Sequence, residues 1–320
     1  MTDFCVTETD PGVSSVVRSS EAVVVSTRQT GFGGEEMGRC LSKALQLCFV
    51  ILTVSNAASR LSAQMIYWGC TANDTIERAE LSGSGRQIVI GPVSNTDPGL
   101  APTCGGIVVD SVQDKIYWTD WGIDIVGVSN PDGSEARVLI DLRAALADQQ
   151  ITNPAPRGIA MDPLNQQLYW ADSGAGTIFT TLVGGSEIIP LVAGLGRPLD
   201  VELDLQNGRM YWTENGGGLI GSANLDGTDV IRNTFQTFIN PLELTLDVEG
   251  GYVYWTASGA IQRGDLLGSD PPITILEDPD SPYGLAFDPV HQLLYWSSYS
   301  TNPGSIHWFD PADETGGVLI

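Results

Sequence analysis

Three carboxylates of this sequence could hold a cation: Asp200, Glu202 and Glu243. They stand in two matching segments, "PLDVELD" and "PLELTLD", at positions where several other copies of the segment carry Gly or Ala. Clustered carboxylate oxygens are the ligands that Ca²⁺ takes. However, no Asp-x-Asp-x-Asp-Gly loop is present, and carboxylates near a channel are more often solvated or paired. We therefore predict no cofactor and keep a bound Ca²⁺ as an alternative interpretation.

The sequence offers little for catalysis. Its two histidines are His291, which we expect in a hairpin turn, and His307, which we expect in an outer strand away from that turn. Enzyme chemistry needs a converging nucleophile, base or metal. The sequence has no Gly-x-Ser-x-Gly, His-Glu-x-x-His or phosphate-binding loop that would supply one. We therefore predict that the protein is not an enzyme.

A repeat explains where these residues must lie. Tyr-Trp occurs six times, at intervals of 41 to 52 residues. Around five copies a seventeen-residue frame aligns without a gap. The frames read "CGGIVVDSVQDKIYWTD", "PRGIAMDPLNQQLYWAD", "PLDVELDLQNGRMYWTE", "PLELTLDVEGGYVYWTA" and "PYGLAFDPVHQLLYWSS". Regular spacing of this length indicates a repeat architecture.

Each frame predicts a β-hairpin: a short apolar strand, a turn that carries Asp, and a second strand that ends at Tyr-Trp. The Asp suits the turn because its carboxylate can accept backbone N–H groups. A second pair of short strands follows each frame, so one period contains four strands. The pattern predicts an all-β, six-bladed β-propeller with four-stranded antiparallel blades. The turn residues are Asp110, Asp162, Asp204, Asp247 and Asp288.

Consecutive residues of a strand point to opposite faces, so Tyr and Trp are both buried only where a strand is covered on both sides. The second strand of a blade lies between two neighbouring blades, which explains the pairs. We predict that these twelve aromatics hold adjacent blades together. They are Tyr67, Trp68, Tyr117, Trp118, Tyr169, Trp170, Tyr211, Trp212, Tyr254, Trp255, Tyr295 and Trp296.

The repeat resembles the low-density lipoprotein receptor class B, or YWTD, repeat, a family whose fold is a six-bladed propeller. The resemblance covers nearly all of residues 64–320. "YWTD" is complete only at Tyr117 to Asp120. Cys70, Ala257 and Ser298 replace the final acid, so we do not expect the hydrogen bond of that acid in blades 1, 5 and 6. The residues before Tyr67 do not match the first part of the seventeen-residue frame, which supplies the innermost strand. Blade 1 is therefore expected to lack that strand.

The N-terminal region reads as a targeting segment. Residues 1–36 form a polar leader that an incorrectly assigned start would explain, with Met37 as the true start. Residues 37–63 have a basic beginning, an apolar run from Ala44 to Val54 and a small-residue cleavage site after Ala63 or near Ala58. We therefore predict export, with a propeller of residues 64–320 outside the cell or in the cell envelope and no membrane span after cleavage.

The charge limits the partners. The whole chain carries a net charge of −24 at pH 7, and the predicted exported part carries close to −23. Such a surface repels phosphate backbones and anionic lipid, so nucleic acid is excluded as a partner. Only Cys70 and Cys104 remain after cleavage, and they lie at one face of adjacent blades. Because export supplies an oxidising environment, we favour a disulfide between them over two unpaired thiols.

Function is expected on the face that carries the loops after Tyr-Trp, because loops on a rigid scaffold commonly bind partners. Two insertions, Gly91 to Thr103 and Asp141 to Arg157, enlarge that face over blades 1 to 3. Tolerated surface insertions are the alternative explanation. The predicted contact residues are Asp120, Trp121, Asp141, Arg143, Asp172, Glu214, Tyr283 and Tyr299.

The sequence thus predicts a secreted, acidic, monomeric binding module that recognises an extracellular protein or a glycan. In the resembling family the propeller is an extracellular recognition domain. A propeller hydrolase or lyase with a cation in the channel is one alternative, because fold alone does not decide function. A structural protein of the envelope or matrix is another.

Overall fold

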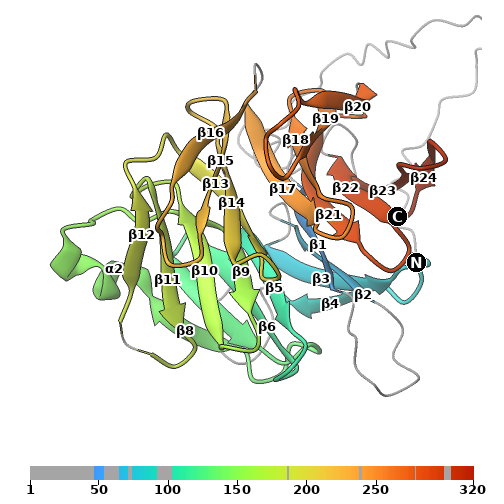
Figure 1. Ribbon diagram of the computed structural model, residues 1–320. Coiled ribbons are helices and arrows are strands. Elements are labelled where there is room, and N and C mark those ends of the chain that lie inside the picture. The colour runs from blue at the N-terminus through green and yellow to red at the C-terminus, as the bar shows by residue number, and fades with distance from the viewer. Residues whose placement is uncertain are drawn as a thin grey trace, which may run out of the picture.

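Six antiparallel sheets of four strands each form the fold. The computed structural model describes residues 47–53, 65–70, 74–91, 103–185, 187–237, 240–277, 279–298 and 304–320, and of 47–53 only the backbone. Figure 1 shows the sheets around a common centre, with β1, β5, β9, β13, β17 and β21 towards the middle and the last strand of each sheet at the periphery. The predicted six-bladed propeller is confirmed.

The strands follow chain order from the centre outward in every blade. Blade 1 contains β1 (Leu47–Thr53), β2 (Met65–Cys70), β3 (Thr75–Glu80) and β4 (Gln87–Ile90); blade 2 contains β5 (Cys104–Asp110), β6 (Lys115–Asp120), β7 (Ile125–Ser129) and β8 (Arg137–Asp141); blade 3 contains β9 (Pro156–Asp162), β10 (Gln167–Asp172), β11 (Thr177–Leu182) and β12 (Ile189–Ala193). Blade 4 contains β13 (Pro198–Asp204), β14 (Arg209–Glu214), β15 (Leu219–Asn224) and β16 (Ile231–Gln236); blade 5 contains β17 (Pro241–Asp247), β18 (Tyr252–Ala257), β19 (Ala260–Asp265) and β20 (Ile273–Glu277); blade 6 contains β21 (Pro282–Asp288), β22 (Leu293–Ser298), β23 (Ser305–Asp310) and β24 (Thr315–Val318). A short helix α2 (Leu142–Ala145) and a 3-10 turn η1 (Ala147–Gln149) follow β8.

Blade 1 differs from the prediction at its innermost position. Three strands, β2 to β4, come from the region predicted to be exported, as expected. The place expected to be empty is occupied by β1, which pairs antiparallel with β2 and aligns Ile51 with Tyr67. An unpaired inner edge of β2 would leave backbone N–H and C=O groups without partners, and the apolar run Leu47–Thr53 supplies them. The predicted leader 1–36 and the cleavage site at Ala63 lie outside the described residues.

The six hydrophobic cores lie between blades. Each core joins the motif Tyr of one blade to the motif Trp of the next, and none of these twelve side chains is more than 6% exposed. The pair Tyr295 and Trp68 joins blade 6 to blade 1 and closes the ring. Burial of one such aromatic stabilises the fold by about 2 to 3 kcal/mol. The other pairs are Tyr67–Trp118, Tyr117–Trp170, Tyr169–Trp212, Tyr211–Trp255 and Tyr254–Trp296.

The third strand of each blade accommodates the motif Trp. A Cβ at Gly127 or Gly221 would lie 2.2 or 2.4 Å from the facing indole ring, so these two positions need glycine. In other blades a flat or polar side chain takes the same place. Phe179 stacks on Trp170 with ring centroids 5.5 Å apart, and Gln262 Oε1 accepts the indole N–H of Trp255 at 3.0 Å. The residue at this position therefore serves packing.

The first hairpin of blades 2 to 6 is held by its turn Asp. Asp110 Oδ1 accepts the backbone N–H groups of Val112 at 2.8 Å and Gln113 at 3.0 Å. Asp162, Asp204, Asp247 and Asp288 accept backbone N–H groups two or three residues ahead in the same way. The repeated carboxylate therefore gives the turns a common geometry.

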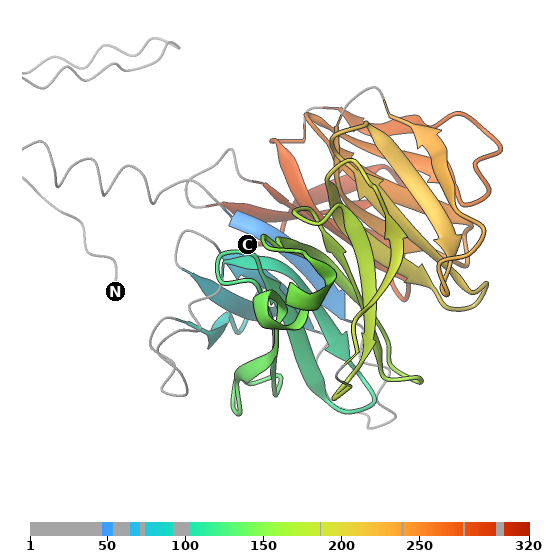
Figure 2. The same ribbon diagram turned by 90° about the vertical axis from the view of Figure 1, so that its left-hand side faces the viewer.

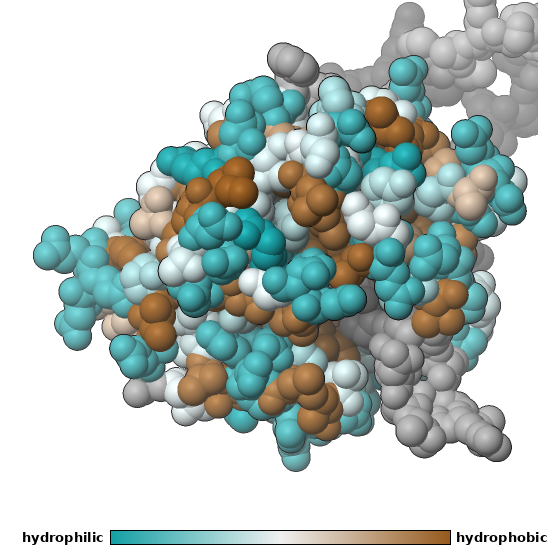
Figure 3. All heavy atoms as spheres, in the orientation of Figure 1, coloured by the Kyte–Doolittle hydropathy of each residue, from teal (hydrophilic) through white to brown (hydrophobic). Residues whose placement is uncertain are grey.

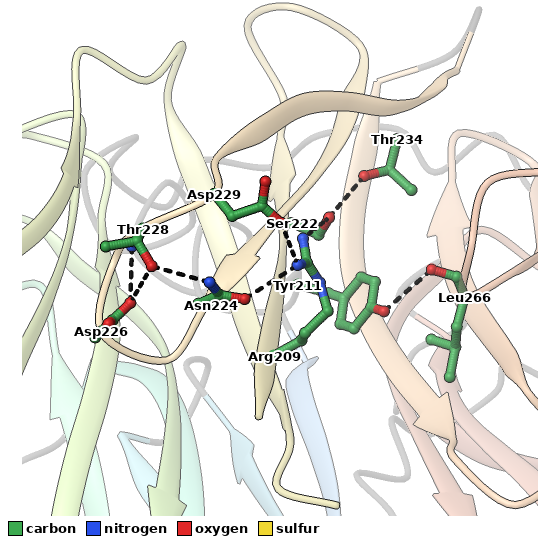
Figure 4. Close-up of polar contacts among 9 residues, drawn as sticks. All are labelled: Arg209, Tyr211, Ser222, Asn224, Asp226, Thr228, Asp229, Thr234 and Leu266. Atoms are coloured by element: carbon green, nitrogen blue, oxygen red, sulfur yellow. Dashed lines mark hydrogen bonds and ion pairs between the residues drawn. The ribbon is translucent and has the colours of Figure 1, made fainter. Parts of the chain in front are cut away.

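Polar contacts also tie a motif Tyr to the next blade, as Figure 4 shows for blade 4. The Tyr211 hydroxyl donates to the carbonyl of Leu266 in blade 5 at 3.1 Å. Arg209, at the start of the same strand, donates to Asn224 Oδ1 at 3.2 Å and to Asp229 Oδ2 at 2.8 Å. This guanidinium is therefore held by the hairpin of its own blade.

Candidate functional site

The propeller has two faces, and the antiparallel order decides what each carries. One, here called the loop face, carries the turns between second and third strands and the connections between blades. The other, here called the hairpin face, carries the turns between first and second strands and between third and fourth strands. The predicted partner contacts belong to the loop face.

Three predicted contact residues, Asp120, Asp172 and Glu214, are fully buried. Asp120 Oδ2 accepts the N–H of Thr103 at 2.9 Å, and its Oδ1 accepts the N–H of Gly122 at 2.8 Å. Burial raises the pKa of Asp120 and of Asp172, although three backbone N–H groups donate to each carboxylate. These carboxylates hold the incoming connection and the following turn. They do not point to solvent, because both are buried and accept backbone N–H groups inside the fold; Asp172 Oδ2, also buried, has no hydrogen-bond partner among the described residues.

Glu214 performs the same task with a longer side chain. Its Oε2 accepts the N–H of Gly196 at 2.7 Å and pairs with Arg232 at 2.7 Å, and its Oε1 accepts the indole N–H of Trp212 at 3.3 Å. Burial opposes the charged form, but these hydrogen bonds outweigh it and lower the pKa of Glu214. In blade 6 the hydroxyl of Ser298, which replaces the acid, donates to the carbonyl of Asp280.

The hydroxyl at the third motif position joins neighbouring blades. Thr256 Oγ1 in blade 5 donates to the carbonyl of Tyr283 in blade 6 at 2.6 Å and accepts the N–H of Glu243 at 3.2 Å. Thr119 and Thr213 donate in the same way to the blade that follows theirs. Gly69 and Ala171 occupy this position in blades 1 and 3 and have no hydroxyl to donate. The repeat thus contains a hydrogen-bonded link between inner strands that the sequence analysis missed.

Trp121 is the predicted contact residue that the loop face presents. It is partly exposed, and the guanidinium carbon of Arg157 in blade 3 lies 4.6 Å from the centre of a Trp121 ring. Arg157 Nε also donates to Ser173 Oγ at 3.2 Å. A cation against an indole face is attractive, and the contact orients both side chains. Arg157 was not predicted, and its contact depends on the neighbouring blade.

The insertion after β8 lies at the outer edge of blades 2 and 3, where Figure 2 shows its helix facing the viewer. Asp141 caps α2 by accepting the N–H of Ala144 at 3.1 Å, and the exposed Arg143 pairs with Asp124 at 2.5 Å. Leu142 and Leu146 are fully buried. The insertion is therefore docked by its apolar residues, and Asp141 and Arg143 mark its exposed side.

The remaining loop-face predictions have different outcomes. Tyr283 is partly buried, and its carbonyl accepts the bond from Thr256. Tyr299 and most of the insertion Gly91 to Thr103 lie outside the described residues. The structure therefore brings Trp121, Asp141 and Arg143 to solvent on or beside the loop face, together with the unpredicted Arg157.

The three channel carboxylates are neighbours in blades 4 and 5. Asp200 is buried, and its Oδ2 accepts the N–H of Leu244 at 2.9 Å, next to Glu243. Burial raises the pKa of Asp200 to about 7. Burial, with the charge of Asp200 two residues away, raises the pKa of Glu202 to about 8. Among the described residues, no group of three or more His, Cys, Asp or Glu is placed to hold a metal ion. The carboxylates thus gain no support as calcium ligands.

The two histidines serve different local roles. His291 Nδ1 lies 2.5 Å from Oδ2 of the turn residue Asp288 on the hairpin face. His307 stacks on Trp296 with centroids 5.1 Å apart, at the third-strand position opposite the motif Trp, and its Nε2 lies 2.7 Å from Ser305 Oγ. Burial lowers the pKa of His307. We interpret His307 as the packing partner of its Trp, the role that Phe179 has in blade 3.

The disulfide between Cys70 and Cys104 stays a prediction. Both side chains are buried, and Cys104 Sγ donates to the carbonyl of Gly106 at 3.6 Å. In the described part of the chain, no helix has the length and apolar character needed to cross a bilayer.

Comparison with known proteins adds to this geometry. No family model matches the chain. It is 31% identical to the low-density lipoprotein receptor-related protein 5 of Mus musculus over 120 residues. These residues are 36% of this chain and 6% of that protein. This chain is a propeller of YWTD-type repeats. Over 83 residues, 26% of this chain, it is 29% identical to the vitellogenin receptor of Solenopsis invicta and covers 4% of it. The chain thus spans only a small part of either receptor.

Solved structures agree on the fold of this YWTD propeller. A structure of a nidogen/laminin complex superposes with a TM-score of 0.66 at 21% identity, over 79% of this chain and 90% of the other. A gluconolactonase of Xanthomonas campestris superposes with a TM-score of 0.63 at 14% identity, over 83% of this chain and 86% of the other. At these identities the likeness concerns the fold alone, and both binding proteins and enzymes share it.

Proposed function

We propose that this propeller is an exported, monomeric, non-catalytic recognition module that binds a protein with a positively charged surface through the loop face over blades 1 to 3. The observation that carries the proposal is the distribution of charge. The predicted exported part has close to 23 more acidic than basic residues. Its few cations make contacts within the protein, so most of the exposed carboxylates are not neutralised.

Nine of the ten Lys and Arg side chains of residues 64–320 make internal contacts. Arg86, for example, pairs with the buried Glu77 at 2.6 Å and lies over the Trp68 ring at 5.6 Å. Arg263 lies 4.2 Å from the ring centre of Tyr252. On the side shown in Figure 3, hydrophobic side chains form separate patches among hydrophilic ones. A negative potential of this kind attracts cationic partners and speeds their association.

The loop face supplies the recognition elements. Trp121 presents an indole whose orientation is held by Arg157, and aromatic side chains are frequent anchors in protein interfaces. Asp141 and Arg143 lie beside it on the docked insertion. The neighbouring structure of a nidogen/laminin complex is one of a protein bound to a protein, which supports a protein partner over a glycan for this fold.

An enzymatic role has less support. The side chains that could take part in catalysis lie apart from the loop-face site of blades 1 to 3. They are Asp200, Glu202 and Glu243 in the inner strands of blades 4 and 5, and His307 in blade 6. Fold likeness to a gluconolactonase does not transfer its chemistry at 14% identity.

Export itself rests on the predicted signal segment. A Cys70–Cys104 disulfide remains a prediction of export, which a non-reduced peptide map of the exported protein tests.

The test is a pull-down of exported proteins and of glycans from the source cells with residues 64–320, at low and high salt. We expect a basic protein to be captured at low salt and released at high salt, because the attraction is electrostatic. Trp121→Ala should weaken capture at least about tenfold, as expected of an interface anchor. Val138→Ser, at an exposed site on the outer strand β8, is the matched control and should leave capture unchanged. Capture of a glycan, or equal capture by Trp121→Ala, would contradict the proposal.

A further inference from the structure

The hairpin face carries a set of exposed apolar side chains with a shared orientation. The backbone N–H groups of Val112, Leu164 and Val290 all donate to the Oδ1 of their turn Asp at 2.8 to 3.0 Å. With the backbone held inward in this way, the side chains project from the turn, and they are 54%, 83% and 55% exposed. Leu205, one position earlier in the turn of blade 4, is 41% exposed.

Two of these turns touch directly, and the others lie on the same face of the ring. Gln166 in the turn of blade 3 donates to Asp110 Oδ2 in the turn of blade 2 at 2.9 Å, so the turns that carry Val112 and Leu164 touch. Leu205 lies in the turn of blade 4, which follows blade 3 in the ring. Val290 lies in the turn of blade 6, which is separated from blade 2 by blade 1. The four residues therefore lie on one face, in blades 2, 3, 4 and 6, and are here called the apolar arc; the corresponding turn of blade 1 lies outside the described residues.

The loop face has no comparable arc in its described part. Of the large hydrophobic residues exposed there, Ile123, at 39%, is the one that lies in a turn of that face. The apolar arc is therefore a property of the hairpin face and not of the propeller surface in general. Exposed apolar side chains gathered on one face and surrounded by a polar rim are typical of interaction sites.

The rim around the apolar arc is acidic. The turns between third and fourth strands lie farther from the axis, and in five blades they carry exposed carboxylates: Asp132, Glu135, Glu187, Asp226, Asp229, Asp270, Asp313 and Glu314. Of these, two have an ion pair in the described part of the chain: Asp229 with Arg209 at 2.8 Å and Glu135 with Lys115 at 3.2 Å. A second copy would bring a like-charged rim against this one, which is unfavourable. Charge complementarity instead selects a cationic occupant.

We propose that the hairpin face is a second docking surface, and that its occupant is an amphipathic basic segment of another protein. Apolar side chains of that segment pack over the apolar arc, and its Lys and Arg side chains lie over the carboxylates of the rim. The proposal is separate from the loop-face function, because no residue is shared between the two surfaces.

Selection of displayed random peptides on the immobilised protein tests the proposal. We expect the selected peptides to be rich in Lys or Arg with spaced apolar residues. Their affinity, measured by fluorescence anisotropy at low salt, should fall at least tenfold for Val112→Ser/Leu164→Ser. It should stay unchanged for Val138→Ser/Ile189→Ser, a control at similarly exposed positions on the outer strands β8 and β12. All substituted sites are exposed, and thermal melts check that the variants fold.

Trp121→Ala separates this surface from the loop face. Peptides that bind Trp121→Ala as tightly as the unaltered protein, and Val112→Ser/Leu164→Ser weakly, support the hairpin face even if no loop-face partner exists. The proposal is overturned if no basic peptide is selected, if the selected peptides lose affinity with Trp121→Ala instead, or if Val112→Ser/Leu164→Ser binds them equally. A dimer in sedimentation that this double variant abolishes would also overturn it, because the occupant would then be a second copy.

Discussion

The carboxylate of Asp200 in blade 4 accepts a hydrogen bond from the backbone N–H of Leu244 in blade 5, at 2.9 Å. Its other oxygen accepts the N–H of Val201 at 2.9 Å and lies where a Cβ at Gly158 of blade 3 would come within 1.8 Å of it. One side chain thus contacts the inner strands of three consecutive blades. Blade 3 has Ala171 where most other blades have the motif hydroxyl. At its boundary with blade 4, Asp200 places a polar side chain against Gly158.

Stability should fall as pH rises because of Asp200 and Glu202. Burial raises their pKa values to about 7 and about 8, so between about pH 4 and pH 8 the folded protein keeps protons that the unfolded chain releases. The stabilising contribution is complete below about pH 4 and is lost as pH rises through the folded pKa values. We expect unfolding in urea to show a free energy at least about 2 kcal/mol lower at pH 8.5 than at pH 5 from this source, because each unit of pKa difference corresponds to about 1.4 kcal/mol.

The variant Asp200→Asn/Glu202→Gln isolates this effect, because the general repulsion of a strongly acidic chain acts in all variants. Its stability should depend less on pH than that of the unaltered protein. The exposed Asp313→Asn is the control and should keep the original dependence. Parallel pH curves for all three proteins would show that the two carboxyls do not titrate as inferred.

Close packing of Gly158 against Asp200 predicts a coupled pair. Gly158→Ala should lower the free energy of unfolding by about 1 to 3 kcal/mol, because a methyl group there overlaps the Asp200 carboxylate. In an Asp200→Ala background the same substitution should cost less, because the 1.8 Å overlap with the carboxylate is removed while the Asp200 Cα stays 2.7 Å away; a double-mutant cycle in urea measures the difference. Gly217→Ala, whose nearest neighbour is the flexible Leu219 side chain at 3.3 Å, is the control. Additive effects at residues 158 and 200 would argue against the contact.

Removal of the Thr256 hydroxyl, which joins blades 5 and 6, should destabilise the protein. Thr256→Val keeps the shape of the side chain but leaves the N–H of Glu243 and the carbonyl of Tyr283 without this partner. We expect a loss of about 1 to 3 kcal/mol in the free energy of unfolding. Thr274→Val removes an exposed hydroxyl that accepts from Gln262 in the same blade, and it should change stability by less than about 0.5 kcal/mol. Equal effects at both sites would show that the Thr256 hydrogen bonds between blades 5 and 6 do not stabilise the fold.

The innermost strand of blade 1 gives a prediction about processing. Cleavage after Ala63 removes β1 and exposes the inner edge of β2, so the chain 64–320 should melt about 10 °C below the chain 45–320. The chain 55–320 keeps the linker without the strand and should behave like 64–320. N-terminal sequencing of the exported protein then shows which form is the natural one, and we expect Gln64 as its first residue. Equal melting temperatures would mean that β1 contributes nothing to the ring.

Much of the fold was determined by the sequence alone. Tyr-Trp pairs at a near-constant interval, with Asp seven residues before each of the last five Tyr residues, encode the second strand and its turn, because local backbone chemistry and alternation act over a few residues. Six such units predict six blades. The sequence also identified the residues that differ between copies, such as Asp200 and Glu243, although not what they contact.

The tertiary structure alone decided which of the predicted contact residues are exposed to solvent. Asp120, Asp172 and Glu214 resemble exposed loop carboxylates in the sequence, but in the ring they are buried by the adjacent blade's connection and accept its N–H groups. Likewise, Arg157 meets Trp121, and the apolar arc forms, only because residues far apart in the chain become neighbours around the axis. Repeat spacing encodes contacts within a blade, whereas surfaces that span blades depend on closure of the ring.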